Sequence, residues 1–336
     1  MQIQARKAKA AALPILLAMR FVALCQTQPA QQPSVRIAAF QGDRAAAVVY
    51  GFDDGLRDQA QIAAPMLEHL GFRGTFFVIP AFVPDTDQEA AAKKPGAFGG
   101  ISWPRLKEMS DHGHEIASHS WSHQAMGLLD DAELAQEVDK ADARIAEKIG
   151  HFPLTFAYPG NGFNNRVHAS VMRRHIAARE SNMFGFGGPA FTAQTANDWV
   201  DGLVRGHQWG ITVIHGIVEG YSPMTSAQVF QDHLNYVKQH EDQIWVDTFA
   251  NVARYMQERD SAKLTVTQQP GQAVCVVRTP LDPSIFNVPL TVVFDAPGAT
   301  QAEAVRSAQK IPVRIAQGRL FVDWVPGPEP VTVTWK

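Results

Sequence analysis

Two aspartates and two histidines stand in a pattern that could hold one metal ion. Asp53 and Asp54 follow a strand-like apolar run, residues 45–50, and His119 and His123 lie four residues apart behind a second short apolar stretch. Two imidazoles and one carboxylate form a ligand set that suits catalytic zinc, which keeps one position open for water or substrate. The aspartate that does not bind the metal is then free to act as a base. The pattern predicts a mononuclear metal site.

A third ionisable group ends another apolar run, because residues 211–214 lead directly into His215. Taken singly, a histidine near an apolar strand is more often a core residue, and Asp-Asp-Gly is often a turn. The joint occurrence favours a shared site. In α/β barrels the chemistry lies at the C-terminal ends of the parallel strands, so three strands that end in ionisable residues indicate one rim.

The elements that must position these residues alternate between short apolar runs and amphipathic runs, which indicates βα units and a mainly parallel sheet. The predicted strands are residues 47–50, 75–79, 115–117, 155–158, 183–186, 211–214 and 244–246. Seven strands with helices between them predict an α/β fold, an incomplete (β/α)7 barrel.

The clearest helix is predicted at 131–149, which has an acidic start, apolar residues at helical spacing and Gly150 as its stop. Further helices are predicted at 59–70 and 104–112. Residues 84–100 are polar and rich in Gly and Ala without periodicity, and they are predicted to form a surface loop near the rim.

The texture changes after residue 260, where short strand-like segments alternate with Pro and Gly turns. Residues 262–336 are therefore predicted to form a small all-β sandwich. Such a domain could bind carbohydrate or simply pack against the barrel, and the sequence leaves both roles open. The predicted strands here are residues 264–267, 273–277, 290–294, 313–315, 320–322 and 331–335.

The motifs together resemble those of the polysaccharide deacetylase family, also called the NodB homology or carbohydrate esterase family 4 group. Its Thr-Phe-Asp-Asp-Gly motif is matched at residues 51–55 with Gly51 in place of Thr, and its His-Ser/Thr-x-x-His motif is matched at 119–123. Its final Leu-x-His motif is matched by Val213-Ile214-His215. The resemblance implies a deacetylase domain over residues 40–259 with the NodB-like barrel fold.

The resemblance also implies roles for these residues. The metal ligands would be Asp54, His119 and His123, holding Zn²⁺ or another divalent first-row metal. Asp53 would be the base, since the first aspartate of that motif is the one left off the metal. His215 would be the general acid that protonates the departing amine or alkoxide.

A third family motif, Arg-x-Pro followed by an aromatic residue and Gly, is matched only in part at 156–160. Aligned on Pro159, the backbone N–H of Gly160 becomes the candidate oxyanion donor. Ala157 replaces the arginine that steadies the base in many members, and Arg205 or another cation could take its place.

The pocket for the acetyl group is predicted from residues near the third motif and the His215 strand. The predicted lining residues are Tyr158, Pro159, Trp209 and Val213. Trp199 is an alternative to Trp209. For either tryptophan, the competing interpretation is ordinary core packing beside a strand.

Composition and the N-terminal segment bear on partners and location. The formal charge of −3 shows no basic excess, so nucleic acid is not an expected partner. Residues 1–30 read as a signal peptide, which predicts export to the periplasm or the exterior. Cys25 allows a lipid anchor, although Leu24 before it argues against one. No later apolar run is long enough to span a bilayer.

The sequence thus predicts an exported enzyme that removes N-acetyl or O-acetyl groups from an acetylated polysaccharide or oligosaccharide. Two alternatives stay open. One is a non-catalytic glycan-binding protein on the same fold, and the other is a hydrolase of a small non-peptide amide.

Overall fold

The computed structural model describes residues 34–336. The predicted signal peptide and Cys25 lie outside the described residues. Within 34–336, no helix is both long enough and apolar enough to cross a membrane.

A parallel sheet of nine strands forms the first part of the fold, with the order β10-β2-β9-β3-β4-β5-β6-β7, and β8 pairs with β9. The ladders within residues 34–336 do not join β7 to β8, so the barrel is incomplete. This confirms the predicted fold class. The strands are β2 (Ala46–Val49), β3 (Gly51–Asp53), β4 (Thr75–Val78), β5 (Glu115–Ser118), β6 (Thr155–Ala157), β7 (Ala177–Arg179), β8 (Met183–Phe186), β9 (Trp209–Ile214) and β10 (Ile244–Val246).

All seven predicted strands of the barrel are present, and the sequence analysis missed two more, β3 and β7. Strands β2 to β5 are almost wholly buried, because helices cover their outer side and side chains fill the barrel. On the helix side, the rings of Phe52 and Phe76 stack with centroids 4.7 Å apart.

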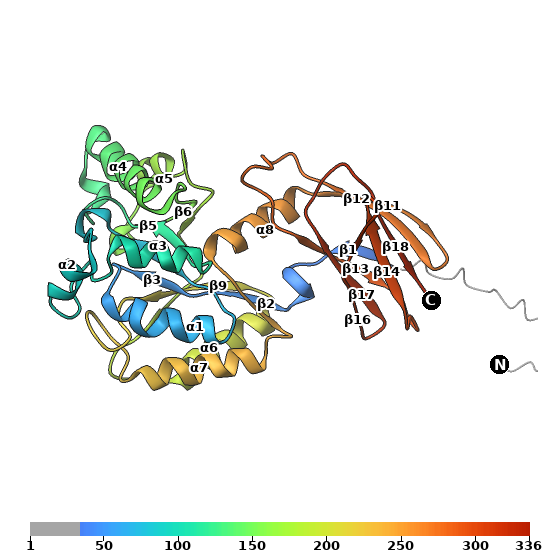
Figure 1. The fold of residues 1–336 in the computed structure, drawn as a ribbon, viewed down its shortest axis with the longest axis horizontal. Helices are drawn as coiled ribbons and strands as arrows, with labels where there is room; N and C mark the ends of the chain where they lie inside the picture. The colour runs from blue at the N-terminus through green and yellow to red at the C-terminus, as the bar shows by residue number, and fades with distance from the viewer. Residues whose placement is uncertain (1–33) are drawn as a thin grey trace, which may run out of the picture. The chain divides into compact units, whose positions relative to one another are not determined.

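The helices lie in two groups on opposite sides of the barrel, with α1, α6 and α7 on one side and α3, α4 and α5 on the other (Figure 1). A π-helical turn, Gln59–Ala63, leads into α1. The α-helices are α1 (Ala64–His69), α2 (Asp87–Ala92), α3 (Trp103–Asp111), α4 (Asp131–Ile149), α5 (Asn165–Val171), α6 (Ala193–Gly206), α7 (Ala227–Gln239) and α8 (Phe249–Ser261).

Local capping signals explain two of these helices. The predicted helix 131–149 is α4, which begins with a capping box between Asp130 and Glu133 and ends at Gly150 with a φ of 100°. The prediction of a loop throughout 84–100 was wrong, because α2 forms there. The capping box of Thr86 and Glu89 is a sequence signal for this helix. It was overlooked because the segment lacks apolar residues at helical spacing.

Two antiparallel sheets form the rest of the fold, with orders β1-β13-β17-β16 and β11-β12-β18-β14-β15. Side chains from both sheets, including Cys275, Phe294, Val322 and Val333, share one buried cluster. The strands are β1 (Val35–Ile37), β11 (Lys263–Gln269), β12 (Gln272–Arg278), β13 (Leu290–Asp295), β14 (Ala302–Arg306), β15 (Gln309–Ile311), β16 (Val313–Ala316), β17 (Arg319–Trp324) and β18 (Val331–Trp335).

One strand of these sheets comes from the N-terminal side of the barrel. β1 pairs antiparallel with β13, so that Val35 lies opposite Phe294. We keep 40–259 and 262–336 as the proposed domain division, with β1 as an N-terminal addition to the second part.

Candidate active site

The ends of parallel strands bring the predicted site residues to one edge of the barrel. Asp53 is the last residue of β3 and lies level with Phe77 of β4 and, beyond it, Ala117 of β5. Phe52 pairs with Ile214 of β9, so His215 emerges beside Asp53. Sequence segments far apart therefore deliver their polar residues to one rim.

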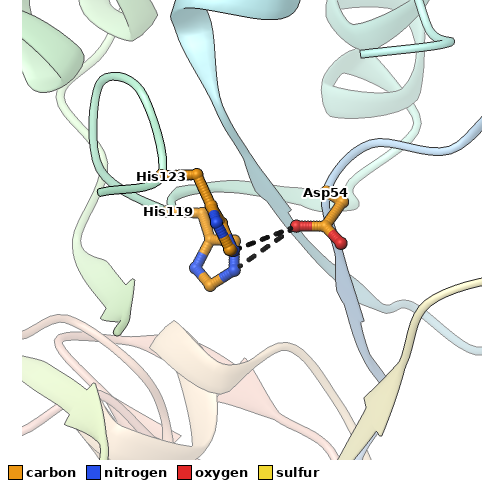
Figure 2. A group of neighbouring side chains, drawn as sticks. All are labelled: Asp54, His119 and His123. Carbon is orange, nitrogen blue, oxygen red and sulfur yellow. Dashed lines mark ion pairs between the residues drawn. The ribbon is translucent and has the colours of Figure 1, made fainter. Parts of the chain in front are cut away.

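Asp54, His119 and His123 form a compact group whose ligand atoms all lie within 4.8 Å of one another. The Oδ1 atom of Asp54 is 3.6 Å from Nε2 of His119 and 3.6 Å from Nε2 of His123. Figure 2 shows both imidazoles facing the Asp54 carboxylate. Two nitrogen ligands of a tetrahedral zinc ion lie about 3.3 Å apart, so these separations are close to those of a metal site.

A backbone contact fixes the orientation of His119. Its Nδ1 lies 2.7 Å from the carbonyl oxygen of Ala157. Because a carbonyl oxygen only accepts, Nδ1 must donate, and Nε2 keeps its lone pair toward Asp54. Burial lowers the pKa of His119 to about 4 and also lowers the pKa of His123. Both rings are therefore neutral near pH 7, the form that binds metal.

The state of Asp54 tests whether this group fits a cation. Its Oδ1 atom is buried and has no hydrogen-bond partner. Burial, and then the negative charge of Asp53, raise the pKa of Asp54 to about 7. A divalent cation between Asp54 and the two imidazoles would satisfy the orphaned oxygen and favour the ionised carboxylate. The donor set therefore fits the predicted metal.

Arg179 binds Asp53 through two parallel hydrogen bonds. Its Nη1 donates to Oδ1 at 2.7 Å and its Nη2 donates to Oδ2 at 2.6 Å. Both residues are almost completely buried. Burial raises the pKa of Asp53, but the charge and hydrogen bonds of Arg179, together with His119 and His215, outweigh it, so this pKa lies below its ordinary value. Asp53 is consequently ionised at neutral pH.

Arg179 also answers the question raised by Ala157. Ala157 of β6 and Arg179 of β7 are direct partners in the ladder between these strands. An arginine is therefore present at the level of Ala157, but on the neighbouring strand. Arg205, the cation named from the sequence, lies exposed near the end of α6 and was the wrong candidate. The signal for Arg179 was the short apolar run 176–178 ahead of it.

Backbone conformations at this edge are strained. Asp54, Ser120, His123 and Asn161 have φ values of 70°, 63°, 60° and 55° without being glycine. Each left-handed residue of this kind costs about 1–2 kcal/mol, and such residues cluster at functional sites. The side chain of Ser120 helps to hold the turn, because its Oγ accepts a hydrogen bond from the N–H of His123 at 3.0 Å.

Gln59 joins the backbones that carry Asp53 and His215. Its buried amide donates to the carbonyl oxygens of both residues, each at 2.6 Å. His215 itself remains about a quarter exposed, and its Nε2 lies 3.9 Å from Oδ2 of Asp54. The histidine is therefore fixed at its backbone while its ring faces both the site and solvent.

The predicted acetyl pocket needs correction at two positions. Tyr158 is fully buried in a core cluster and donates its hydroxyl to Glu180 at 3.0 Å, so it has no surface for a substrate. Trp209 begins β9, at the far end from His215, and stacks on Phe249. Both are core residues, which for Trp209 was the competing interpretation.

The remaining pocket candidates stay compatible with their predicted roles. Gly160 is exposed in a short 3₁₀ turn, Pro159–Asn161, with a φ of 60°. Pro159 is buried at the start of that turn, and Val213 is half-buried two residues before His215. Trp199 lies in α6 and stacks on Phe184.

Comparison with known proteins agrees with the motifs. Residues 41–176 match the family model described as polysaccharide deacetylase. The chain is 27% identical over 121 residues to chitin deacetylase 1 of Saccharomyces cerevisiae, a match that covers 36% of this chain and 34% of that protein. These findings agree with the family resemblance, which the family model places on residues 41–176.

Other relatives cover different shares of the chain. A Bacillus protein named gellan lyase is 26% identical over 324 residues, which is 82% of this chain and 12% of that protein. A peptidoglycan N-acetylglucosamine deacetylase of Listeria monocytogenes is 24% identical over 36% of this chain and 22% of its own. The chain thus spans far less than two thirds of these curated relatives.

Among solved structures, a Mycobacterium smegmatis protein assigned to the polysaccharide deacetylases superposes with a TM-score of 0.52. It is 13% identical and covers 70% of this chain and 98% of that one. At this identity the likeness supports the fold alone.

Proposed function

We propose that this protein is a metal-dependent hydrolase that removes acetyl groups from a carbohydrate polymer. The observation that carries the proposal is the convergence at one strand edge of an orphaned carboxylate with two neutral imidazoles, an arginine-bound aspartate and a partly exposed histidine. The family resemblance supplies the expected reaction.

Asp54, His119 and His123 are the proposed metal ligands, and Zn²⁺ or another divalent first-row metal is the proposed ion. When bound, such an ion lowers the pKa of water and polarises an acyl oxygen. The contact between His119 and Ala157 would keep the ring oriented toward that ion.

Asp53 is the proposed general base. Its ionised carboxylate keeps unused lone pairs beyond the two that Arg179 occupies, and its Oδ2 lies 4.0 Å from Nε2 of His119. A water held beside the ligands could pass its proton to this oxygen. Arg179 would fix the carboxylate plane and keep Asp53 charged throughout.

His215 is the proposed general acid. It lies across Asp54 from the metal histidines, and its partial exposure lets it reach the leaving nitrogen or oxygen of a sugar. The N–H of Gly160 is the proposed donor to the developing oxyanion, and Pro159 and Val213 are the proposed neighbours of the acetyl methyl group.

The proposed substrate is an acetylated polysaccharide or oligosaccharide. Three of the relatives are named for polysaccharides, namely gellan, chitin and peptidoglycan. An N-acetyl amide and an O-acetyl ester would use the same residues. Export of the enzyme, as the leader predicts, would place it where such polymers occur.

The test is elemental analysis of bound metal combined with acetate release from acetylated chitin-type, peptidoglycan-type and xylan-type substrates. Metal-free and zinc-reconstituted protein would be compared side by side. We expect acetate release only in the reconstituted sample. Bound metal with no release from any glycan would favour a glycan-binding protein or a hydrolase of small amides.

A further inference from the structure

The two proposed metal histidines are held in different ways. His119 directly follows β5, is buried, and has its ring fixed by the carbonyl oxygen of Ala157. His123 lies in an irregular segment, and its side chain is 26% exposed. Because neither a strand nor full burial fixes His123, its position depends on the path of the backbone that carries it. We call residues 120–124 the histidine loop.

The backbone of the histidine loop is strained and needs support. Ser120 and His123 both have left-handed φ values, 63° and 60°, which residues other than glycine adopt only at a cost. The hydrogen bond from the N–H of His123 to Oγ of Ser120 spans the turn from inside. Further support comes from α4, which packs against β5.

Glu137 of α4 binds the histidine loop with both carboxylate oxygens. Its Oε2 accepts a hydrogen bond from the N–H of Ser122 at 2.9 Å, and its Oε1 accepts one from the Ser122 hydroxyl at 2.6 Å. The side-chain amide of Gln124 donates to Oε1 at 3.3 Å. The backbone carbonyl of Glu137 accepts a hydrogen bond from the N–H of Trp121 at 2.8 Å. One residue thus contacts the loop on both sides of His123.

The start of the loop is anchored separately, at Trp121. The ammonium nitrogen of Lys140, one turn further along α4, lies 3.9 Å from the centroid of the Trp121 ring, an attractive cation–π arrangement. The carbonyl oxygen of Trp121 accepts a hydrogen bond from the N–H of Ala81 at 3.0 Å. These contacts fix the first half of the loop, and the Glu137 carboxylate acts on the half that carries His123.

Glu137 occupies a position on α4 where the helical pattern calls for an apolar residue. It lies on the buried face with Leu134, Val138 and Ala141, and it is 4% exposed. Burial of a carboxylate is unfavourable unless hydrogen bonds compensate for it, and the bonds to the loop do so here. A residue needed only for packing would be apolar at this position. The carboxylate therefore points to a role in the loop.

We propose that Glu137 is a positioning residue of the metal site, which holds His123 where its Nε2 can share an ion with Asp54 and His119. This inference rests on the proposed metal site and adds to it a residue that touches neither metal nor substrate. Partners that orient metal ligands typically contribute about 10- to 100-fold to metal affinity. The effect of Glu137 should therefore be measured first as affinity for the metal.

The test is the zinc affinity of the full chain, measured by competition with a chromophoric chelator. Glu137→Ala should raise the zinc dissociation constant about 10- to 100-fold. Glu137→Gln keeps one acceptor oxygen and should raise it by less. Ser122→Ala, which leaves α4 unchanged, should also raise it and provides a test even if Glu137→Ala does not fold. Adding Ser122→Ala to Glu137→Ala should have little further effect, because both changes break one contact.

Asp142→Asn is the matched control. Asp142 is a second buried carboxylate on the same face of α4, but it faces His175 at 3.3 Å and lines the cleft at the opposite end of the barrel strands from the metal ligands. Asp142→Asn and Glu137→Gln are the same chemical change on one helix. Only Glu137→Gln should raise the zinc dissociation constant, whatever each change does to thermal stability of the metal-free protein.

A second measurement follows the geometry of the site directly. Bound Co²⁺ in place of zinc absorbs visible light in bands that depend on the arrangement of its ligands. We expect the cobalt spectrum to change in Glu137→Ala and Glu137→Gln and to keep the wild-type form in Asp142→Asn. A purely structural role of Glu137 would lower the melting temperature and leave this spectrum as it is.

Failure of the inference differs from failure of the proposed function. If the Glu137 variants bound zinc as tightly as the wild type and kept its cobalt spectrum, the inference would be overturned and the metal site would stand. The same holds if Asp142→Asn weakened zinc binding as much as Glu137→Gln. A wild type that bound no zinc would overturn both the inference and the proposed metal-dependent function.

Discussion

Asp53 is a buried carboxylate and Glu115 a half-buried one, and they lie at opposite ends of the same parallel sheet with different partners. Asp53 ends β3 and is bound by the guanidinium of Arg179. Glu115 begins β5 and accepts hydrogen bonds from neutral donors, namely the hydroxyls of Thr75 and Thr155 and the N–H of Ala250. Burial raises the pKa of Glu115, whereas that of Asp53 is lowered.

The difference shows that burial of a charge does not by itself mark a functional site. Both oxygens of Glu115 have partners, so this residue ties β5 to its neighbours and to the start of α8. Beside Asp53, in contrast, Asp54 has an oxygen without a partner and a left-handed backbone. Orphaned polar atoms and strain are features that a purely structural site has no reason to keep.

A large cleft does not by itself mark the functional end of the sheet either. A cleft of about 590 Å³ lies at the Glu115 end and is lined by Glu115, His114 and Arg254, among others. The metal-ligand end is better recognised by its chemistry. A test of the comparison must therefore change these residues one at a time.

The largest effect is expected for His119→Ala. Loss of one imidazole should remove the metal and lower activity by about a thousandfold or more, because the proposed ion activates both water and substrate. Elemental analysis and acetate release would be measured together. His112→Ala, a half-exposed histidine outside the site, is the control. Normal metal content in His119→Ala would refute the proposed metal site.

The second effect is expected for Asp53→Asn. Without its base the enzyme should lose about 10²- to 10⁴-fold in kcat while it retains the metal. Asp54→Asn should instead lose the metal. If Asp53→Asn lost metal and Asp54→Asn kept it, the roles of the two aspartates would have to be exchanged.

The third effect is expected for Arg179→Met, which leaves the buried carboxylate of Asp53 without its counter-charge. We expect the free energy of unfolding to fall by about 3 kcal/mol, since removal of one partner from a buried ion pair is strongly destabilising. Urea denaturation would measure it. Arg205→Met, at an exposed position, should change stability by less than about 0.5 kcal/mol. Equal effects would refute the assignment of Arg179.

The smallest effect is expected for Glu115→Gln. The folded chain holds the proton of Glu115 at pH values where the unfolded chain has released it, so stability should fall as pH rises from about 4.3 toward the raised folded pKa. Gln removes this fall, so the variant should gain stability relative to the wild type as pH rises toward neutrality. Thermal melts at several pH values would show it, and activity should not change. A variant that lost stability at neutral pH would indicate that the carboxylate is required.

Much of the fold was predictable because its signals are local. The seven predicted strands are apolar runs, and α4 carries its own capping residues. β3, β7, β14 and β15 were missed because short strands with mixed residues owe their form to their neighbours in the sheet. β1 could not be assigned to the antiparallel sheets, since its partner β13 lies more than 250 residues later.

The sequence alone determined the proposed metal ligands, because Asp53-Asp54 and the histidine pair are short motifs whose spacing is set by a turn after a strand. The tertiary structure decided which cation steadies Asp53, since Arg179 approaches from β7, 126 residues away. It also decided that Tyr158 and Trp209 pack in the core. Partners across parallel strand ends meet only when the whole sheet has formed, and no spacing along the chain encodes that meeting.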